Sequence, residues 1–67
     1  MVNGKKIRLM REAEGLTTQS FADKIVISQA YVIAIEKGYK RPAIDVLARI
    51  AEYFDLSVDD FLIKGGA

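Results

Sequence analysis

The segment from residue 28 to residue 41 carries side chains suited to hydrogen bonding with base edges and to charge pairing with phosphates. The amide of Gln29 matches the N6 and N7 groups of adenine. Lys37, Lys40 and Arg41 follow it and can pair with phosphate oxygens. A polar reader followed by cations is typical of a surface that binds a nucleic acid.

Hydroxyl and backbone amide groups add candidate phosphate contacts. The hydroxyls of Tyr31 and Tyr39 can donate to phosphate oxygens. The starts of two expected helices, at Thr18–Gln19 and at Ser28–Gln29, leave backbone N–H groups unpaired, and such groups attract anions. These groups would fix the position of a nucleic acid without reading its sequence.

Apolar side chains share the outward face of the second of these helices. On a helical projection, Ala30, Ile33 and Ala34 fall beside Gln29. They can contact thymine methyl groups, which together with Gln29 predicts a site that leans toward A·T pairs. The same apolar face could equally be a contact surface for a protein.

Catalysis has little support in these residues. The chain has no histidine and no cysteine, which removes the commonest general base and any thiolate metal ligand. Favourable charge at the start of a helix explains the adjacent carboxylates of Asp59 and Asp60. No glycine-rich phosphate loop is present, so we expect no enzymatic activity, no metal site and no cofactor.

Two short helix patterns joined by a turn position the candidate binding residues. Thr17 is a suitable N-cap for the first helix and Ser28 for the second. Gly38 stands where a helix ends in the left-handed conformation. Helices over residues 18–25 and 29–37 therefore form a helix-turn-helix.

The whole chain, residues 1–67, is predicted to be one compact all-α domain. Its clearest periodicity joins Leu47, Ile50, Ala51 and Phe54, which share one helix face. No alternation typical of strands appears. The five expected helices span residues 4–14, 18–25, 29–37, 43–54 and 58–63.

The net charge of +1 conceals an uneven distribution. Residues 1–41 contain eight Lys and Arg against four Asp and Glu, whereas residues 42–67 contain two against five. The positive part holds the helix-turn-helix, which suits a polyanionic partner. No apolar run approaches the ~18 residues that span a bilayer, and no signal-peptide core is present. We expect a cytoplasmic protein with no membrane partner.

A set of spaced residues carries a family resemblance: Ile7, Arg11, Gly15-Leu16-Thr17, Phe21-Ala22, Ile27-Ser28, Tyr31-Val32, Ala34-Ile35-Glu36-Lys37-Gly38, Pro42, Leu47, Ile50-Ala51 and Leu56-Ser57-Val58-Asp59. Through them the chain resembles the Cro and phage-repressor type of domain, the lambda-repressor-like XRE family. The resemblance implies a five-helix DNA-binding domain, usually a dimer, that represses or activates transcription. The chain has no room for a separate sensor domain, so no small-molecule ligand is expected.

The resemblance also implies roles for individual residues. Arg11 of the first helix would pair with Glu36 near the end of the reading helix and fix how that helix is presented. Thr18 stands where the family usually has glutamine, which weakens the phosphate contact expected there. Val26 stands in the turn where the family usually has glycine. A β-branched residue with positive φ is strained by roughly 1–2 kcal/mol, which favours a reshaped turn.

The C-terminal segment offers a candidate dimer interface. Leu56, Phe61, Leu62 and Ile63 are more apolar than a small core needs, and a chain this short is marginally stable alone. We expect these side chains to join two copies of the chain. The alternative is that most of them close the core of one copy.

These patterns predict a sequence-specific DNA-binding regulator of transcription, expected to be a repressor. A homodimer would place the helix over residues 29–37 in successive major grooves of a near-palindromic double-stranded operator. The alternative is a protein-interaction module on the same fold, of the antitoxin or anti-repressor kind. Such a module would use the apolar outward face of the same helix.

Overall fold

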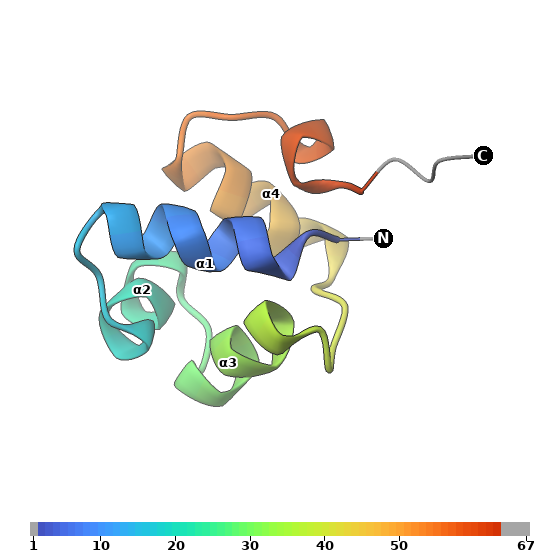
Figure 1. Cartoon of the computed structure of the whole chain (residues 1–67). Helices are drawn as coiled ribbons and strands as arrows, with labels where there is room; N and C mark the ends of the chain where they lie inside the picture. The colour runs from blue at the N-terminus through green and yellow to red at the C-terminus, as the bar shows by residue number, and fades with distance from the viewer. Residues whose placement is uncertain (1, 64–67) are drawn as a thin grey trace.

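The computed structural model describes residues 2–63 of the chain and is all-α in that range (Figure 1). Its four α-helices are followed by one short 3-10 helix. A single antiparallel bridge between Val2 and Leu62 brings the two ends of the described chain together. The elements are α1 (Gly4–Ala13), α2 (Thr18–Ile25), α3 (Gln29–Lys37), α4 (Ile44–Tyr53) and η1 (Val58–Phe61).

The last element differs from the helix expected over residues 58–63. It is a 3-10 helix that ends at Phe61, because the chain then becomes extended at Leu62 and pairs with Val2. The backbone N–H of Asn3, the N-cap of α1, donates to the carbonyl oxygen of Phe61 at 2.6 Å, so this carbonyl is not bonded within a longer helix. The α-helix count is therefore four rather than five.

Side-chain caps begin α1 and α2. Asn3 Oδ1 accepts from the backbone N–H of Lys6 at 3.0 Å and begins α1. Thr17 and Ser20 form a reciprocal pair at the start of α2, each side-chain oxygen accepting from the other's backbone N–H. These local bonds explain why α1 and α2 begin where the sequence predicts.

The core lies between the inward faces of all five elements. The periodic face of α4 contributes Leu47, Ile50 and Ala51, all buried. Phe54, next along this pattern, is half-buried and stacks 5.5 Å from Phe21, centroid to centroid. The other buried apolar residues of the described chain are Ile7, Phe21, Ala22, Ile25, Val32, Ile35, Val46 and Phe61.

The four candidate dimer residues differ in how far each is buried in the core. Phe61 is 0% exposed and fills the core, so the expectation that it forms a dimer interface is wrong. Leu56 and Leu62 are half-buried and pack against the same core. Ile63 is 48% exposed. Closure of the core between α1, α4 and η1 accounts for most of this apolar segment.

Within residues 2–63, no helix combines the length and the apolar character that a membrane crossing requires.

Gly4 allows α1 to approach the end of α3 closely. A Cβ atom at this position would overlap the carbonyl oxygen of Ile35 and lie 2.9 Å from that of Glu36. Alanine normally favours a helix over glycine by about 1 kcal/mol. Here we expect Gly4→Ala to destabilise the protein by about 1–3 kcal/mol, because backbone on both sides must move. Urea unfolding followed by circular dichroism measures this change, and Lys5→Ala in the same turn is the matched control. A more stable Gly4→Ala protein would contradict this packing of α1 on α3.

Candidate nucleic-acid interface

α3 presents two different faces because its apolar residues follow the helical repeat. Val32 and Ile35 are buried in the core. Gln29, Ala30 and Lys37 are exposed on the other side. Ile33 and Ala34, also predicted to face outward, are half-buried. The outward face is therefore less apolar than the sequence suggests, with its exposed polar groups at its two ends.

The ends of α3 are fixed by local hydrogen bonds. Ser28 Oγ accepts from the backbone N–H of Tyr31 at 3.1 Å and begins the helix. Gly38 is left-handed at φ 80° and ends it. The next backbone N–H, from Tyr39, donates to the carbonyl of Ala34 at 2.8 Å. This reversal turns the following loop, residues 38–42, back along the side of α3. Because it contains Lys40 and Arg41, it is called the basic loop below.

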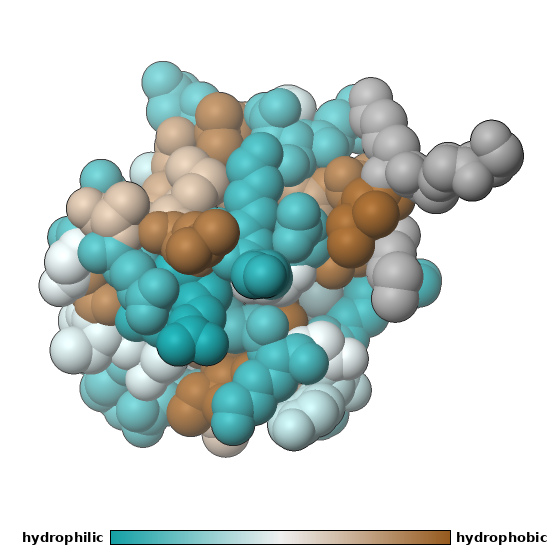
Figure 2. Space-filling model, in the orientation of Figure 1, coloured by the Kyte–Doolittle hydropathy of each residue, from teal (hydrophilic) through white to brown (hydrophobic). Residues whose placement is uncertain are grey.

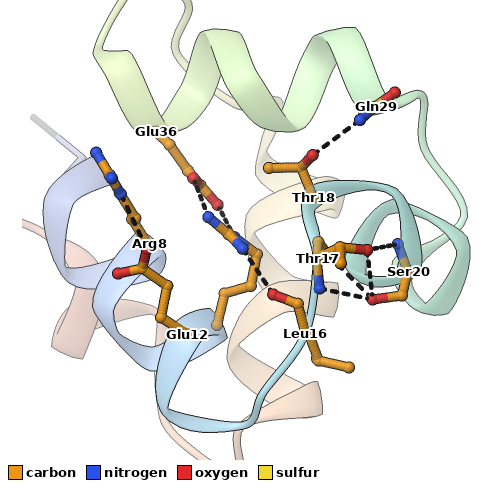
Figure 3. A network of polar contacts seen from close by, with 9 residues as sticks. Arg8, Glu12, Leu16, Thr17, Thr18, Ser20, Gln29 and Glu36 are labelled. Carbon is orange, nitrogen blue, oxygen red and sulfur yellow. Dashed lines mark hydrogen bonds and ion pairs between the residues drawn. The ribbon is translucent and has the colours of Figure 1, made fainter.

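A hydrogen bond joins the first residues of α2 and α3. Gln29 Nε2 donates to Thr18 Oγ1 at 2.9 Å (Figure 3). The Thr18 hydroxyl accepts in this bond, so its own O–H remains available as a donor to a phosphate. Gln29 keeps its Oε1 and its second N–H for a base edge. Gln19 is exposed beside them and donates to Asp23 Oδ1 at 3.0 Å.

The basic loop is tied to α3 through a tyrosine hydroxyl. Tyr31 Oη accepts from the backbone N–H of Ala43 at 2.9 Å, which leaves its O–H proton free to donate. Lys40 and Arg41 are exposed in the loop, as is Tyr39. The loop and α3 enclose an open hollow of about 580 Å³ that brings together six residues, Ser28, Ala30, Tyr31, Ala34, Lys40 and Arg41.

A buried ion pair joins α1 to the end of α3. Arg11 Nε and Nη2 donate to the two carboxylate oxygens of Glu36 at 2.7 and 3.1 Å, a bidentate arrangement (Figure 3). The two side chains are only 9% and 6% exposed. Arg11 Nη1 also donates to the carbonyl of Leu16 at 2.6 Å, so the same guanidinium holds the turn before α2.

The electrostatic environment of Arg11 keeps it charged. The hydrogen bonds from its guanidinium to Glu36 raise the pKa of Arg11 above its usual value, while burial opposes this shift and the negative charge of Glu36 adds to it. Because both partners are removed from water, their attraction is weakly screened.

A second hollow adds Arg8 to the candidate phosphate-binding residues. The sequence patterns did not single out this residue. The volume of the hollow is about 270 Å³, and it is lined by Arg8, Arg11, Thr18, Ile33, Glu36 and Lys37. Arg8 is exposed and pairs with Glu12 at 3.4 Å. Arg8 lies one helical turn before Arg11 on α1. This i, i+3 spacing places both arginines on one face of the helix, and it could have predicted that Arg8 lies near the site.

The turn between α2 and α3 retains the left-handed geometry. Val26 has φ 60° and ψ 53°, so the expectation of a reshaped turn is wrong. Its backbone N–H and that of Ile27 both bond to the carbonyl of Ala22, which closes the end of α2. The Val26 side chain is 74% exposed, and its methyl groups therefore avoid the core.

Comparisons with known proteins point to one family. A model of the helix-turn-helix family matches residues 7–61. An uncharacterised HTH-type transcriptional regulator of Methanocaldococcus jannaschii is 33% identical over 58 residues, covering 87% of this chain and 88% of the relative. The chain spans about half the length of several other curated regulators that it matches.

Solved structures give the same picture. The N-terminal DNA-binding domain of SinR from Bacillus subtilis superposes with a TM-score of 0.81 at 25% identity, covering 96% of this chain and 94% of that one. The biofilm master regulator SinR in complex with DNA superposes with a TM-score of 0.75 at 26% identity, covering 84% and 90%.

Proposed function

The chain belongs to the XRE-type helix-turn-helix family, and from this premise we propose that it is a sequence-specific repressor that places α3 in the DNA major groove. The family and the fold are those of DNA-binding transcriptional regulators and not of enzymes. The proposal places the protein in the cytoplasm with double-stranded DNA as its partner.

One observation carries the proposal. α3 exposes Gln29 at its first turn and Lys37 at its last turn, and the adjoining loop exposes Lys40 and Arg41. A reading helix needs a polar group near its start that reaches base edges and cations that meet the phosphates at either side. The hydroxyls of Thr18 and Tyr31 have protons to donate beside these cations.

We further propose that two copies act together on a near-palindromic operator. Two reading helices must then lie about 34 Å apart to enter successive major grooves. Apolar side chains gather beside the ends of the described chain on the face drawn in Figure 2. Val2, Ile44 and Leu62 line one hollow, in which Ile44 is 75% exposed, and Ile63, next to Leu62 in the chain, is 48% exposed. These residues replace Phe61 in the proposed dimer surface.

A protein-interaction module remains the second candidate. Ala30 is exposed beside the half-buried Ile33 and Ala34, and such a surface could receive an apolar partner. The cations around it favour DNA. A protein-only module would not be retained on a DNA column at moderate salt.

Selection from a random duplex library followed by sequencing tests the proposal. We expect enrichment of a near-palindrome with A·T-leaning half-sites one helical turn apart. Recovery without enrichment would mean that the protein binds only the phosphate backbone. No recovery at low salt would favour the protein-interaction module. Light scattering with and without the enriched duplex measures whether two copies assemble.

The substitution Gln29→Ala separates base reading from phosphate binding. We expect it to reduce discrimination by about 1–3 kcal/mol at one or two positions of the half-site. The double substitution Lys40→Ala with Arg41→Ala is expected to weaken binding to every sequence and to lower the salt slope by about 2. Titrations of selected and random duplexes at several salt concentrations measure both effects. Equal weakening of all sequences by Gln29→Ala would remove Gln29 from the base readers.

A further inference from the structure

A cation from α4 lies against the turn that joins α2 to α3. Arg49 Nη1 donates to the carbonyl oxygen of Ile25 at 2.9 Å and to that of Val26 at 3.3 Å. Carbonyls at the end of a helix lack partners within the helix. A positive charge at that end also interacts favourably with the helix dipole. Arg49 therefore satisfies the end of α2 from outside the helix-turn-helix.

This contact falls on the most strained backbone position of the turn. Val26 is β-branched, and its left-handed conformation at φ 60° is rarely adopted by such residues. Its side chain is 74% exposed, so packing contributes little to holding the conformation. Strain of this kind persists only where the surroundings impose it. The imposed contacts are the bonds to Ala22 and the two bonds from Arg49.

The guanidinium of Arg49 also forms a weak, exposed ion pair within α4. Arg49 Nη2 lies 3.5 Å from Asp45 Oδ2, one turn earlier on α4. Within residues 2–63, the hydrogen bonds of Arg49 go to Ile25, Val26 and Asp45, so none of them joins it to the proposed DNA-reading residues.

We propose that Arg49 is a positioning residue for DNA binding: it holds the glycine-free turn left-handed and so fixes the angle at which α3 is presented. The inference rests on the proposed function in one respect, that α3 is the reading helix. It predicts a specific coupling between residues 49 and 26. Glycine at position 26 adopts the left-handed conformation without strain and should make Arg49 dispensable.

The first test is independent of DNA. Residual dipolar couplings report the angle between α2 and α3 in the free protein. We expect Arg49→Met, which keeps much of the apolar stem, to change this angle, whereas Val26→Gly with Arg49→Met keeps it. An unchanged angle in Arg49→Met would overturn the proposal. Should Arg49→Met alone fail to fold, the double variant is expected to fold. An unfolded double variant would overturn the proposal, because Arg49 would then act beyond the turn.

The second test asks whether the angle matters for recognition. We expect Arg49→Met to lower the ratio of operator affinity to random-duplex affinity by about tenfold, the size of one hydrogen bond to a charged group. Arg49→Lys is expected to recover most of this ratio. Asp45→Asn, which removes only the exposed ion pair, should change it less than about twofold. Affinities are compared at temperatures where circular dichroism shows each variant fully folded.

The outcomes of the two tests are distinguishable. An unchanged affinity ratio, or an equal loss in the Val26→Gly background, would overturn the positioning role while leaving the DNA-binding function intact. If the wild-type protein enriches no operator, the proposed function fails. In that case the dipolar couplings alone decide whether Arg49 sets the geometry of α3.

Discussion

Replacing Glu36 with glutamine is expected to lower the free energy of unfolding by about 3–5 kcal/mol. The substitution keeps the shape of the side chain but removes its charge, which leaves the guanidinium of Arg11 buried without a counter-ion. The amide can still accept one hydrogen bond, yet its N–H group would face the donors of Arg11. A stranded buried charge is among the largest single effects on stability.

The expected loss is comparable with the whole stability of the chain. Proteins have about 0.05–0.15 kcal/mol of unfolding free energy per residue, or roughly 3–10 kcal/mol for a chain of this length. Glu36→Gln should therefore lose a large share of its stability and have a much larger unfolded fraction than the wild-type protein near physiological temperature. Urea and thermal unfolding followed by circular dichroism measure the change. The pair ties α1 to the last turn of α3 and so helps to hold α3 in the folded domain. DNA binding by Glu36→Gln should therefore fall in proportion to the fraction of protein that is folded.

A surface ion pair supplies the matched control. Arg8 and Glu12 are spaced i, i+4 on α1, and their side chains are 59% and 48% exposed. Glu12→Gln should change the unfolding free energy by less than about 0.5 kcal/mol. A second control replaces both buried partners, as Arg11→Met with Glu36→Leu, and should be more stable than Glu36→Gln alone. If Glu36→Gln and Glu12→Gln behave alike, the buried pair is not a major determinant of this fold.

The elements with strong local signals were predictable from the sequence. α2 and α3 have the predicted bounds because Thr17, Ser28 and Gly38 set their ends through bonds to residues within one turn. Asp55, two residues after the end of α4, is left-handed at φ 58°. α1 and α4 are slightly shorter than predicted, as is common where terminal turns fray. The bounds of α3 therefore follow from local chemistry.

Features that depend on distant residues were not predictable. The end of η1 is set by Val2 and Asn3, nearly the whole chain away. The left-handed Val26 is supported by Arg49 of α4, which no spacing rule connects to the turn. Periodicity reports which face of an element is apolar but not which polar group of another element will meet a given carbonyl. The same limit applies to the bond between Gln29 and Thr18.

Phe61 is a residue whose role, in the core or in a dimer interface, could not be predicted from apolar periodicity alone. The sequence leaves open whether its ring joins two copies or closes one core, and the structure buries it completely. We expect Phe61→Ala to lower the unfolding free energy by about 3–5 kcal/mol through lost burial and the cavity left behind. The cavity would open beside Phe54, whose ring centroid lies 6.2 Å away.

Protein concentration distinguishes a core role from a dimer role. A residue that acts only through a dimer changes stability in a concentration-dependent way, because association binds the native state by mass action. We expect the effect of Phe61→Ala to be the same at low and high protein concentration when urea unfolding is measured at both. Ile63→Ala, at the half-exposed neighbouring position, should change the low-concentration value by less than about 0.5 kcal/mol. A loss at Phe61 that disappears on dilution would contradict the core role, whereas a loss at Ile63 that grows with concentration would support the proposed dimer surface.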